Sequence, residues 1–192
     1  MWKWIGGIVL IIILCFAAAI WTGYRKLTAD GDAATVTIAG TPERIFAALA
    51  THDSLPSWYV LKGQPAPAGH GLIAIGDSLP AQIPQSASRG RKSRWVADTV
   101  VPGKLIALSL HTDTAVVAVR RDSLVSIGDS TEIISTISSP LMENVKARNP
   151  GGARLIGVSS KLLVSAMRLQ SKVELLRLKN HIEGRPVEAV QP

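Results

Sequence analysis

Hydrophobic residues recur every three or four positions toward the C-terminus of the chain. The row consists of Leu155, Val158, Leu162, Ala166, Leu169, Val173 and Leu176. This spacing places the row on one face of a helix, opposite a set of basic residues. Gly184 and Pro186 end the pattern, because glycine tolerates the left-handed conformation after a helix and proline cannot continue one. The pattern predicts a helix over 155–182, on the order of 40 Å long.

Alternating apolar and polar residues predict strands in the middle of the chain. Runs rich in Val, Ile and Thr are separated by turn residues such as Pro102-Gly103 and Gly128-Asp129, a spacing typical of an antiparallel meander. In the last run Ile133 and Ile137 share one face, whereas Glu132, Ile134 and Thr136 share the other. The expected strands are 34–38, 94–101, 104–112, 115–127 and 131–138.

Two short helices are expected after the first strand. Thr41, Pro42 and Glu43 form an N-cap, a first-turn proline and a first-turn acid, which together predict a helix ending near Ala50. Residues 52–58 predict a second short helix or turn. Short strands are expected at 59–61 and 73–75, and the rest of 63–93 is predicted to be a long loop. The resulting order predicts an α+β domain with one sheet face covered by the long helix.

The N-terminus carries an apolar run from Ile5 to Tyr24. About twenty uncharged residues suffice for the roughly 30 Å hydrocarbon core of a bilayer, and aromatic residues stand at both ends. A cleaved signal peptide is the alternative, but the run is longer than an ordinary signal-peptide core. We therefore expect residues 1–26 to be a retained single-pass membrane helix, followed by a linker over 27–33.

Charge gives only a weak indication of membrane orientation. Lys3 stands before the apolar run and Arg25 and Lys26 stand after it, so the positive-inside rule nearly ties. The short basic N-terminal tail favours an extracytoplasmic domain. The net charge is +7, but without Lys3, Arg25 and Lys26 the rest of the chain has 18 basic and 14 acidic residues, a mild surplus of +4. This surplus suits a domain near anionic lipid headgroups better than a nucleic-acid binder, whose basic residues would cluster with aromatic ones.

The titratable residues do not form a recognisable catalytic or metal-binding motif. Cys15 is the only cysteine, and none of the four histidines pairs with a second ligand on one element. Ser109 and His111 share a strand face, but side chains two apart on a strand stand about 6–7 Å from each other, too far for a catalytic triad. The basic segment 89–94 is expected to be a solvated loop. We predict no catalytic residue, no metal site and no cofactor.

Four stretches of the chain together match a known pattern. They are residues 35–49, Pro56-Ser57-Trp58, residues 121–133 and residues 176–184. In this order they resemble the opening strand and helix, the tryptophan after the second helix, the late hairpin and the end of the long helix of the START-like, or polyketide cyclase/SRPBCC, superfamily. The resemblance implies a helix-grip fold over 34–184, in which a curved antiparallel sheet surrounds the C-terminal helix, with a short tail over 185–192. It also implies an apolar cavity between the sheet and the helix.

Five residues are candidates for lining such a cavity. Large apolar side chains and one histidine are expected to face the space between sheet and helix, although packing of the core alone also explains them. The ligand-binding candidates are Phe46, Trp58, Trp95, His111 and Met167.

Three functions remain open from the sequence. The first is a membrane-anchored, non-catalytic module that binds a hydrophobic ligand such as a lipid or quinone. The second is an accessory structural subunit of a larger membrane complex, respiratory or photosynthetic, with other subunits as partners. The third is an enzyme of the cyclase or hydrolase type, which we rank last. The expected partners are membrane lipid, other subunits of a complex and a hydrophobic small molecule, and not nucleic acid.

Overall fold

The computed structural model describes five parts of the chain, with gaps between them. By its internal contacts the chain divides into Met1–Gly31 and Asp32–Pro192, and every described residue belongs to the second unit. The predicted membrane helix over 1–26 and most of the linker lie outside the described residues. So does the predicted basic loop up to Lys92. The described residues are 33–59, 70–81, 93–112, 115–140 and 153–185.

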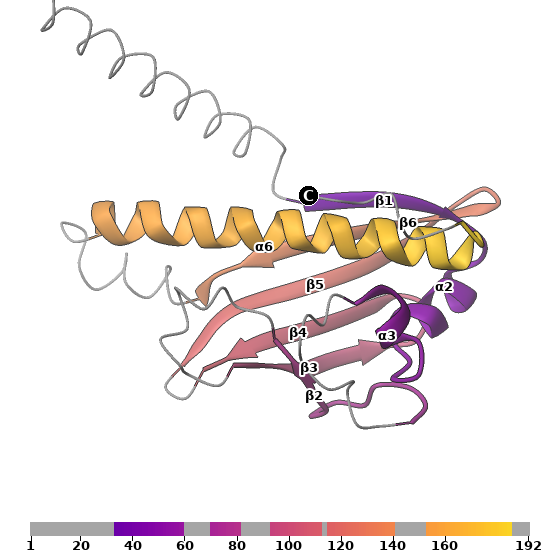
Figure 1. The fold of residues 1–192 in the computed structure, drawn as a ribbon, viewed down its shortest axis with the longest axis horizontal. Coiled ribbons are helices and arrows are strands. Elements are labelled where there is room, and N and C mark those ends of the chain that lie inside the picture. Colours follow the sequence, from indigo (N-terminus) through magenta and orange to yellow (C-terminus); the bar gives the residue numbers. More distant parts are fainter. Residues whose placement is uncertain (1–32, 60–69, 82–92, 113–114, 141–152, 186–192) are drawn as a thin grey trace, which may run out of the picture. The chain divides into compact units, whose positions relative to one another are not determined.

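The structure is an α+β arrangement of one antiparallel sheet and a long C-terminal helix (Figure 1). Six strands lie in the order β1-β6-β5-β4-β3-β2, and every neighbouring pair is antiparallel. Helix α6 lies along β1 and β6, while α2 and α3 pack beside it at one end. The elements are β1 (Ala33–Ala39), α2 (Pro42–Leu49), α3 (Leu55–Trp58), β2 (Ser78–Pro80), β3 (Arg94–Val101), β4 (Leu105–His111), β5 (Val116–Ile127), β6 (Ser130–Ser138) and α6 (Ala153–Ile182).

The four central strands agree closely with the predicted meander, because their turns carry the residues that tight turns require. Gly103 joins β3 to β4 with a φ of 69°, and Gly128 joins β5 to β6 with a φ of 58°. Both values lie in the left-handed region, which favours glycine. The alternation predicted for β6 is also correct, since Ile133 and Ile137 are buried whereas Thr136 is exposed. This register directs one face of the sheet toward α6.

Helix α2 begins as predicted. The Thr41 side chain accepts a hydrogen bond from the backbone N–H of Arg44 at 3.5 Å, Pro42 stands in the first turn, and Glu43 is the first-turn acid. These residues satisfy or complement the unpaired N–H groups of a helix N-terminus. The apolar face of α2, which includes Phe46, is buried in the core.

Of the two short strands predicted between α3 and β3, one is not formed and the other lies mostly outside the described residues. Tyr59 follows α3 outside any strand, and the other residues of 59–61 lie outside the described part of the chain. Residues 73–75 are not a strand; Leu72 makes an isolated bridge to Thr51, and the edge strand β2 forms a few residues later. A three-residue edge strand ending at Pro80 has too few positions to show an alternating pattern, which is why the sequence did not locate it.

The predicted apolar face of α6 is wrong by about half a turn. Leu169 is 51% exposed, and Ala166 is exposed as well. The face that packs on the sheet carries Leu175 and Leu178, which have no exposed surface, and also Ser171 and Glu174. Because two positions of the buried face are polar, a search for apolar spacing selected the neighbouring row. Part of the predicted row, up to Leu162, lies where the side chains are outside the structural description.

Within the described ranges, none of the helices has the length and apolar character needed to cross a bilayer.

The corrected face of α6 leads to a matched pair of substitutions. Leu175→Ala should lower the free energy of unfolding by about 2–5 kcal/mol, because it leaves a cavity in the core. Leu169→Ala, on the same helix, should change it by less than about 0.5 kcal/mol. Equilibrium urea unfolding of the full chain in mild detergent, followed by circular dichroism, measures both. Equal destabilisation by the two substitutions would contradict the observed orientation of α6.

Candidate functional site

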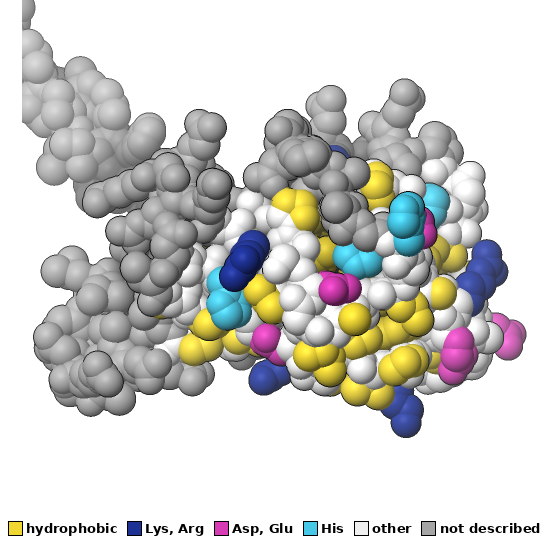
Figure 2. Space-filling view, turned by 90° about the horizontal axis from the view of Figure 1, so that it is seen from below, with side chains coloured by type: hydrophobic (Ala, Val, Ile, Leu, Met, Phe, Trp, Pro, Cys, Tyr) yellow, Lys and Arg dark blue, Asp and Glu magenta, His cyan; other side chains and the backbone are white. Residues whose placement is uncertain are grey.

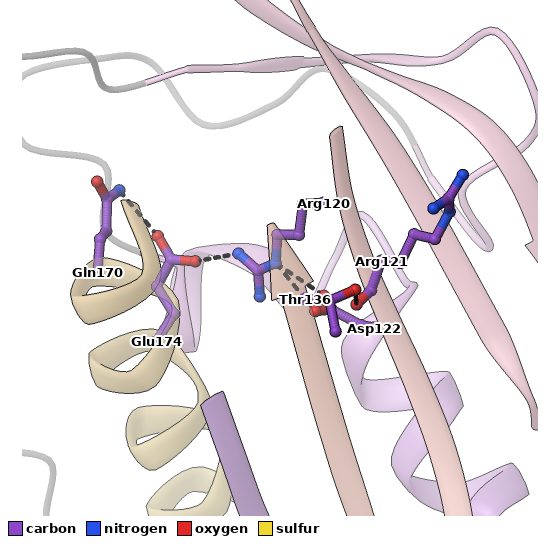
Figure 3. A network of polar contacts seen from close by, with 6 residues as sticks. All are labelled: Arg120, Arg121, Asp122, Thr136, Gln170 and Glu174. Carbon is purple, nitrogen blue, oxygen red and sulfur yellow. Dashed lines mark hydrogen bonds and ion pairs between the residues drawn. The ribbon is translucent and has the colours of Figure 1, made fainter. Parts of the chain in front are cut away.

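A charged cluster lies between the sheet and α6. Strand β5 places Arg120 and Asp122 two residues apart on the face that looks toward the helix, in phase with the buried residues Ala118 and Leu124. Helix α6 contributes Glu174 from the opposite side (Figure 3). Arg120, Asp122 and Glu174 are 4%, 2% and 1% exposed. Residues of this type are almost never so buried without charged partners, and here each one has a partner.

The guanidinium of Arg120 joins the two carboxylates. Its Nε donates to both oxygens of Asp122, at 3.1 and 2.9 Å, and its Nη1 donates to Glu174 Oε2 at 2.5 Å. The other Glu174 oxygen accepts from the Gln170 side-chain amide at 3.0 Å. The next residue on β5, Arg121, points away from this cluster (Figure 3). The network therefore ties α6 to the middle of the sheet.

The cluster contains more negative than positive charge. Burial raises the pKa of Glu174, and the attraction of Arg120 offsets only part of that rise. Burial alone lowers the pKa of Arg120, but the nearby carboxylates of Asp122 and Glu174 raise it overall, so the guanidinium stays charged. A buried ion cluster of this kind adds little net stability compared with apolar side chains, whereas removing one partner is costly. Such a cluster is therefore a candidate for function.

Two polar atoms near this cluster are buried without a hydrogen-bond partner. They are Arg120 Nη2 and the hydroxyl oxygen of Ser135. Ser135 pairs directly with Asp122 in the β5–β6 register and faces the same side of the sheet. An unsatisfied buried polar group costs free energy, and in folded proteins such groups usually have a protein, water or ligand partner.

Two of the three charged residues, Arg120 and Asp122, line a small, mainly apolar cavity. Its volume is about 10 Å³, which is room for roughly one water molecule. The walls come from the α2–α3 region, from residues 73 and 79, and from β4 and β5. The lining residues are Leu49, Leu55, Trp58, Tyr59, Ile73, Leu79, Ile106, Leu108, Arg120 and Asp122.

Two aromatic residues from the α3 end of the cavity have fixed positions. Trp58 donates its indole N–H to the carbonyl of Ala48 at 3.1 Å and packs edge-on against Tyr59, with ring centres 5.7 Å apart. The Tyr59 hydroxyl donates to the carbonyl of Pro80 at 3.1 Å. Burial, followed by the charge of Glu174, raises the pKa of Tyr59, so the phenol stays neutral. These hydrogen bonds therefore hold two of the lining residues in place.

The five residues proposed from the sequence are not gathered at one place. Trp58 lines the cavity. Phe46 and Trp95 are buried in the same core but do not line it, and Met167 is partly buried against that core. His111 lies at the end of β4, is half-buried and directly follows the inward-facing Leu110, so strand alternation places it on the outer face of the sheet.

Ser109, which shares a strand face with His111, makes its own contact on the outer face of the sheet. The Ser109 hydroxyl donates to the Asp98 carboxylate of the neighbouring strand, so Ser109 has a structural partner that is not a histidine. Ser109 is thus engaged with a neighbouring strand and not with His111.

The sequence reasoning missed Arg120, Asp122 and Glu174. Charged residues were assigned to the solvent side by default. The signal was nevertheless present, because Arg120 and Asp122 occupy the same alternation phase as Ala118 and Leu124 in a strand whose other features were predicted correctly. A charge in the buried phase of a strand indicates a partner across the core.

Two histidine–aspartate pairs hold residues 70–77 to the link between α2 and α3. His52 Nε2 lies 3.1 Å from Asp77 Oδ2, and His70 Nδ1 lies 3.1 Å from Asp53 Oδ1. Figure 2 shows histidine side chains beside acidic ones on this face. The hydrogen bond from His70 lowers the pKa of Asp53, and those from the Ala74 N–H and His52 lower that of Asp77. Within the described ranges, no three potential metal ligands gather into a site.

Comparisons with known proteins show the fold. No protein-family model and no curated protein matches the sequence. Among solved structures, the KanY protein matches with a TM-score of 0.54 and 16% identity, over 80% of this chain and 97% of that chain. CalU16 from Micromonospora echinospora matches with a TM-score of 0.51 and 12% identity, over 79% and 73%. The Aha1 dimer from Colwellia psychrerythraea matches with a TM-score of 0.50 and 17% identity, over 78% and 92%. The chain therefore shares an α+β fold with these proteins.

The raised pKa of Glu174 has a consequence for stability. The folded state holds this proton in a pH range where the unfolded chain has released it, so the contribution of Glu174 to the free energy of unfolding falls as pH rises above the ordinary value of 4.5. The loss reaches at most about 1.4 kcal/mol per pH unit. Glu174→Gln should remove this dependence.

Urea unfolding from about pH 4 to pH 8 measures the effect as the difference between the wild-type chain and Glu174→Gln. Glu132→Gln, on the outer face of β6 and outside the network, is the matched control and should keep the wild-type slope. If the pH profiles of the free energy of unfolding were parallel for the wild type and Glu174→Gln, the buried Glu174 carboxyl would not take up a proton on folding in this pH range.

Proposed function

We propose that this chain is a START-like helix-grip domain that binds an apolar molecule between its sheet and the α2–α3 region, without catalysing a reaction on it. The observation that carries the proposal is the cavity itself, whose walls are apolar except for one end formed by Arg120 and Asp122. Small-molecule sites in proteins are typically of this kind, with apolar walls and a few fixed polar groups.

The position of the cavity supports this proposal. Its lining side chains come from α2, α3, β4, β5 and the segment 70–81, so the cavity lies where the helices cover the sheet. Two of the lining residues, Ile106 and Leu108, alternate along β4 toward the helix side. A shift of the covering elements would therefore enlarge a space whose floor is the sheet.

A ligand larger than water requires one wall to move, and the segment 70–81 is the best candidate. It carries Ile73 and Leu79 into the cavity. Hydrogen bonds rather than a continuous strand pairing hold most of it, including Ile73 N–H to the Ala50 carbonyl at 2.7 Å. Local segments held by few contacts open at lower free energy than core strands. In this proposal, displacement of 70–81 admits the ligand.

The proposed source of the ligand is a membrane. The uncharged run Ile5–Tyr24 supports a membrane anchor over 1–26, which would keep the domain beside its lipid. The weak excess of basic charge supports contact with anionic headgroups. Membrane lipid is thus both the proposed partner and the proposed supply of the apolar molecule.

One observation favours a second candidate function, that of an accessory structural subunit of a membrane complex. A cavity of about 10 Å³ leaves the core nearly close-packed. A domain of this kind could serve through its surface, with partner subunits and no bound small molecule. The experiment below separates the two functions.

Purification of the full chain in mild detergent, followed by native mass spectrometry, tests the binding function. We expect about one apolar molecule per chain on the wild-type protein. Leu108→Phe fills the cavity and should abolish this stoichiometric ligand, at a cost in stability of about 1–3 kcal/mol.

Leu124→Phe is the control, because Leu124 is buried on the neighbouring strand but does not line the cavity. It should be similarly destabilised and should keep the ligand. Protein partners in a fixed ratio that survive a salt wash, with no small molecule on any variant, would establish the structural-subunit function instead.

A further inference from the structure

If the proposed binding function holds, the charged residues that line the cavity indicate which polar group the ligand carries. The walls opposite Arg120 and Asp122 are apolar, so a bound molecule would place its hydrocarbon part there and its polar part at the cluster. The chemistry of that polar part follows from the hydrogen-bonding groups left over and from the net charge.

Two buried groups are left over, and both lie on the face of the sheet that looks toward α6. Arg120 uses Nε and Nη1 on the carboxylates, which leaves Nη2 as a donor without a partner. The Ser135 hydroxyl is unpartnered as well, and it stands across from Asp122 in the strand register. Of these two groups, Arg120 lines the cavity and Ser135 does not. Strand β6, which carries Ser135, lies on the side of β5 away from β4 and its lining residues. Arg120 Nη2 is therefore the donor available to an oxygen atom of a ligand.

The charge of the cluster limits which oxygen this can be. One guanidinium faces two carboxylates, so the cluster carries a charge of −1 when both are ionised and zero when Glu174 is protonated. Neither state leaves a surplus positive charge. A carboxylate or phosphate head would therefore meet either a negatively charged site or a neutral one. In both cases its own charge would be buried without compensation, which is costly.

We propose that the cavity selects an uncharged apolar molecule that carries a carbonyl or hydroxyl oxygen at one end, and that it rejects fatty acids and other anions. Arg120 Nη2 is the donor to this oxygen. Asp122 and Glu174 set the selectivity because they neutralise the guanidinium before the ligand arrives.

Three probes of equal chain length test this proposal by isothermal titration calorimetry with the full chain in mild detergent. They are decan-2-one, decanoate and decane, used at about pH 8, where decanoate is ionised. The ketone should bind at least about tenfold more tightly than either decanoate or decane. Decane cannot accept a hydrogen bond from Arg120, and decanoate can accept one only by burying an uncompensated negative charge.

Isosteric substitutions then assign the selectivity to the cluster. Asp122→Asn and Glu174→Gln each remove one negative charge. Each should lower the ratio of ketone affinity to decanoate affinity by about tenfold or more. Ser135→Ala changes a buried position outside the cavity lining and keeps all three charges in place, so it should keep the wild-type preference. Lys172→Gln, an exposed change of one charge on α6, is the control and should alter none of these ratios.

The outcomes separate this inference from the function on which it rests. Failure of all three probes to bind would overturn the proposed function and this inference with it. Binding of decanoate as tightly as the ketone would leave the function intact and overturn the inference. The inference would also be overturned if Asp122→Asn and Glu174→Gln fold normally and both keep the wild-type selectivity.

Discussion

The guanidinium of Arg120, held between carboxylates from two different elements, fixes how the C-terminal helix lies on the sheet. Asp122 reaches it from the same strand and Glu174 reaches it from α6, and all three are almost completely buried. Apolar packing would allow α6 to rotate or slide at modest cost, because hydrophobic contact is not directional. A charged hydrogen bond is directional, so the buried cluster selects one rotation of the helix.

This constraint explains why the apolar row of α6 was a misleading guide. The helix turns Ser171 and Glu174 inward together with Leu175, and it leaves Leu169 in solvent. An amphipathic pattern predicts the existence and length of such a helix reliably, since both depend on the helical period. It cannot predict the buried face when that face contains an ion pair whose partner lies more than fifty residues away.

The remaining fold followed from local chemistry where local chemistry was decisive. Gly103 and Gly128 required left-handed turns, so β3 to β6 were found within a residue or two at their ends. Strand β2 was not found, because its three residues are held by pairing with β3 and not by their own pattern. For the cavity, only Trp58 among the five candidates lines it. Aromatic size predicted burial but not which buried residues border an empty space, since that depends on packing from several elements.

The position of Glu174 in the chain also affects how the protein is made. Arg120 and Asp122 leave the ribosome well before α6, and for that interval the sheet has a charged patch on the face that will become its core. Strand β1 likewise cannot pair until β6, its only strand neighbour among the described strands, has been synthesised. Both ends of the domain are therefore needed before it closes, and such long-range contacts slow folding. The nascent chain, with its apolar segment already synthesised, would spend this time as an open sheet that a chaperone could recognise.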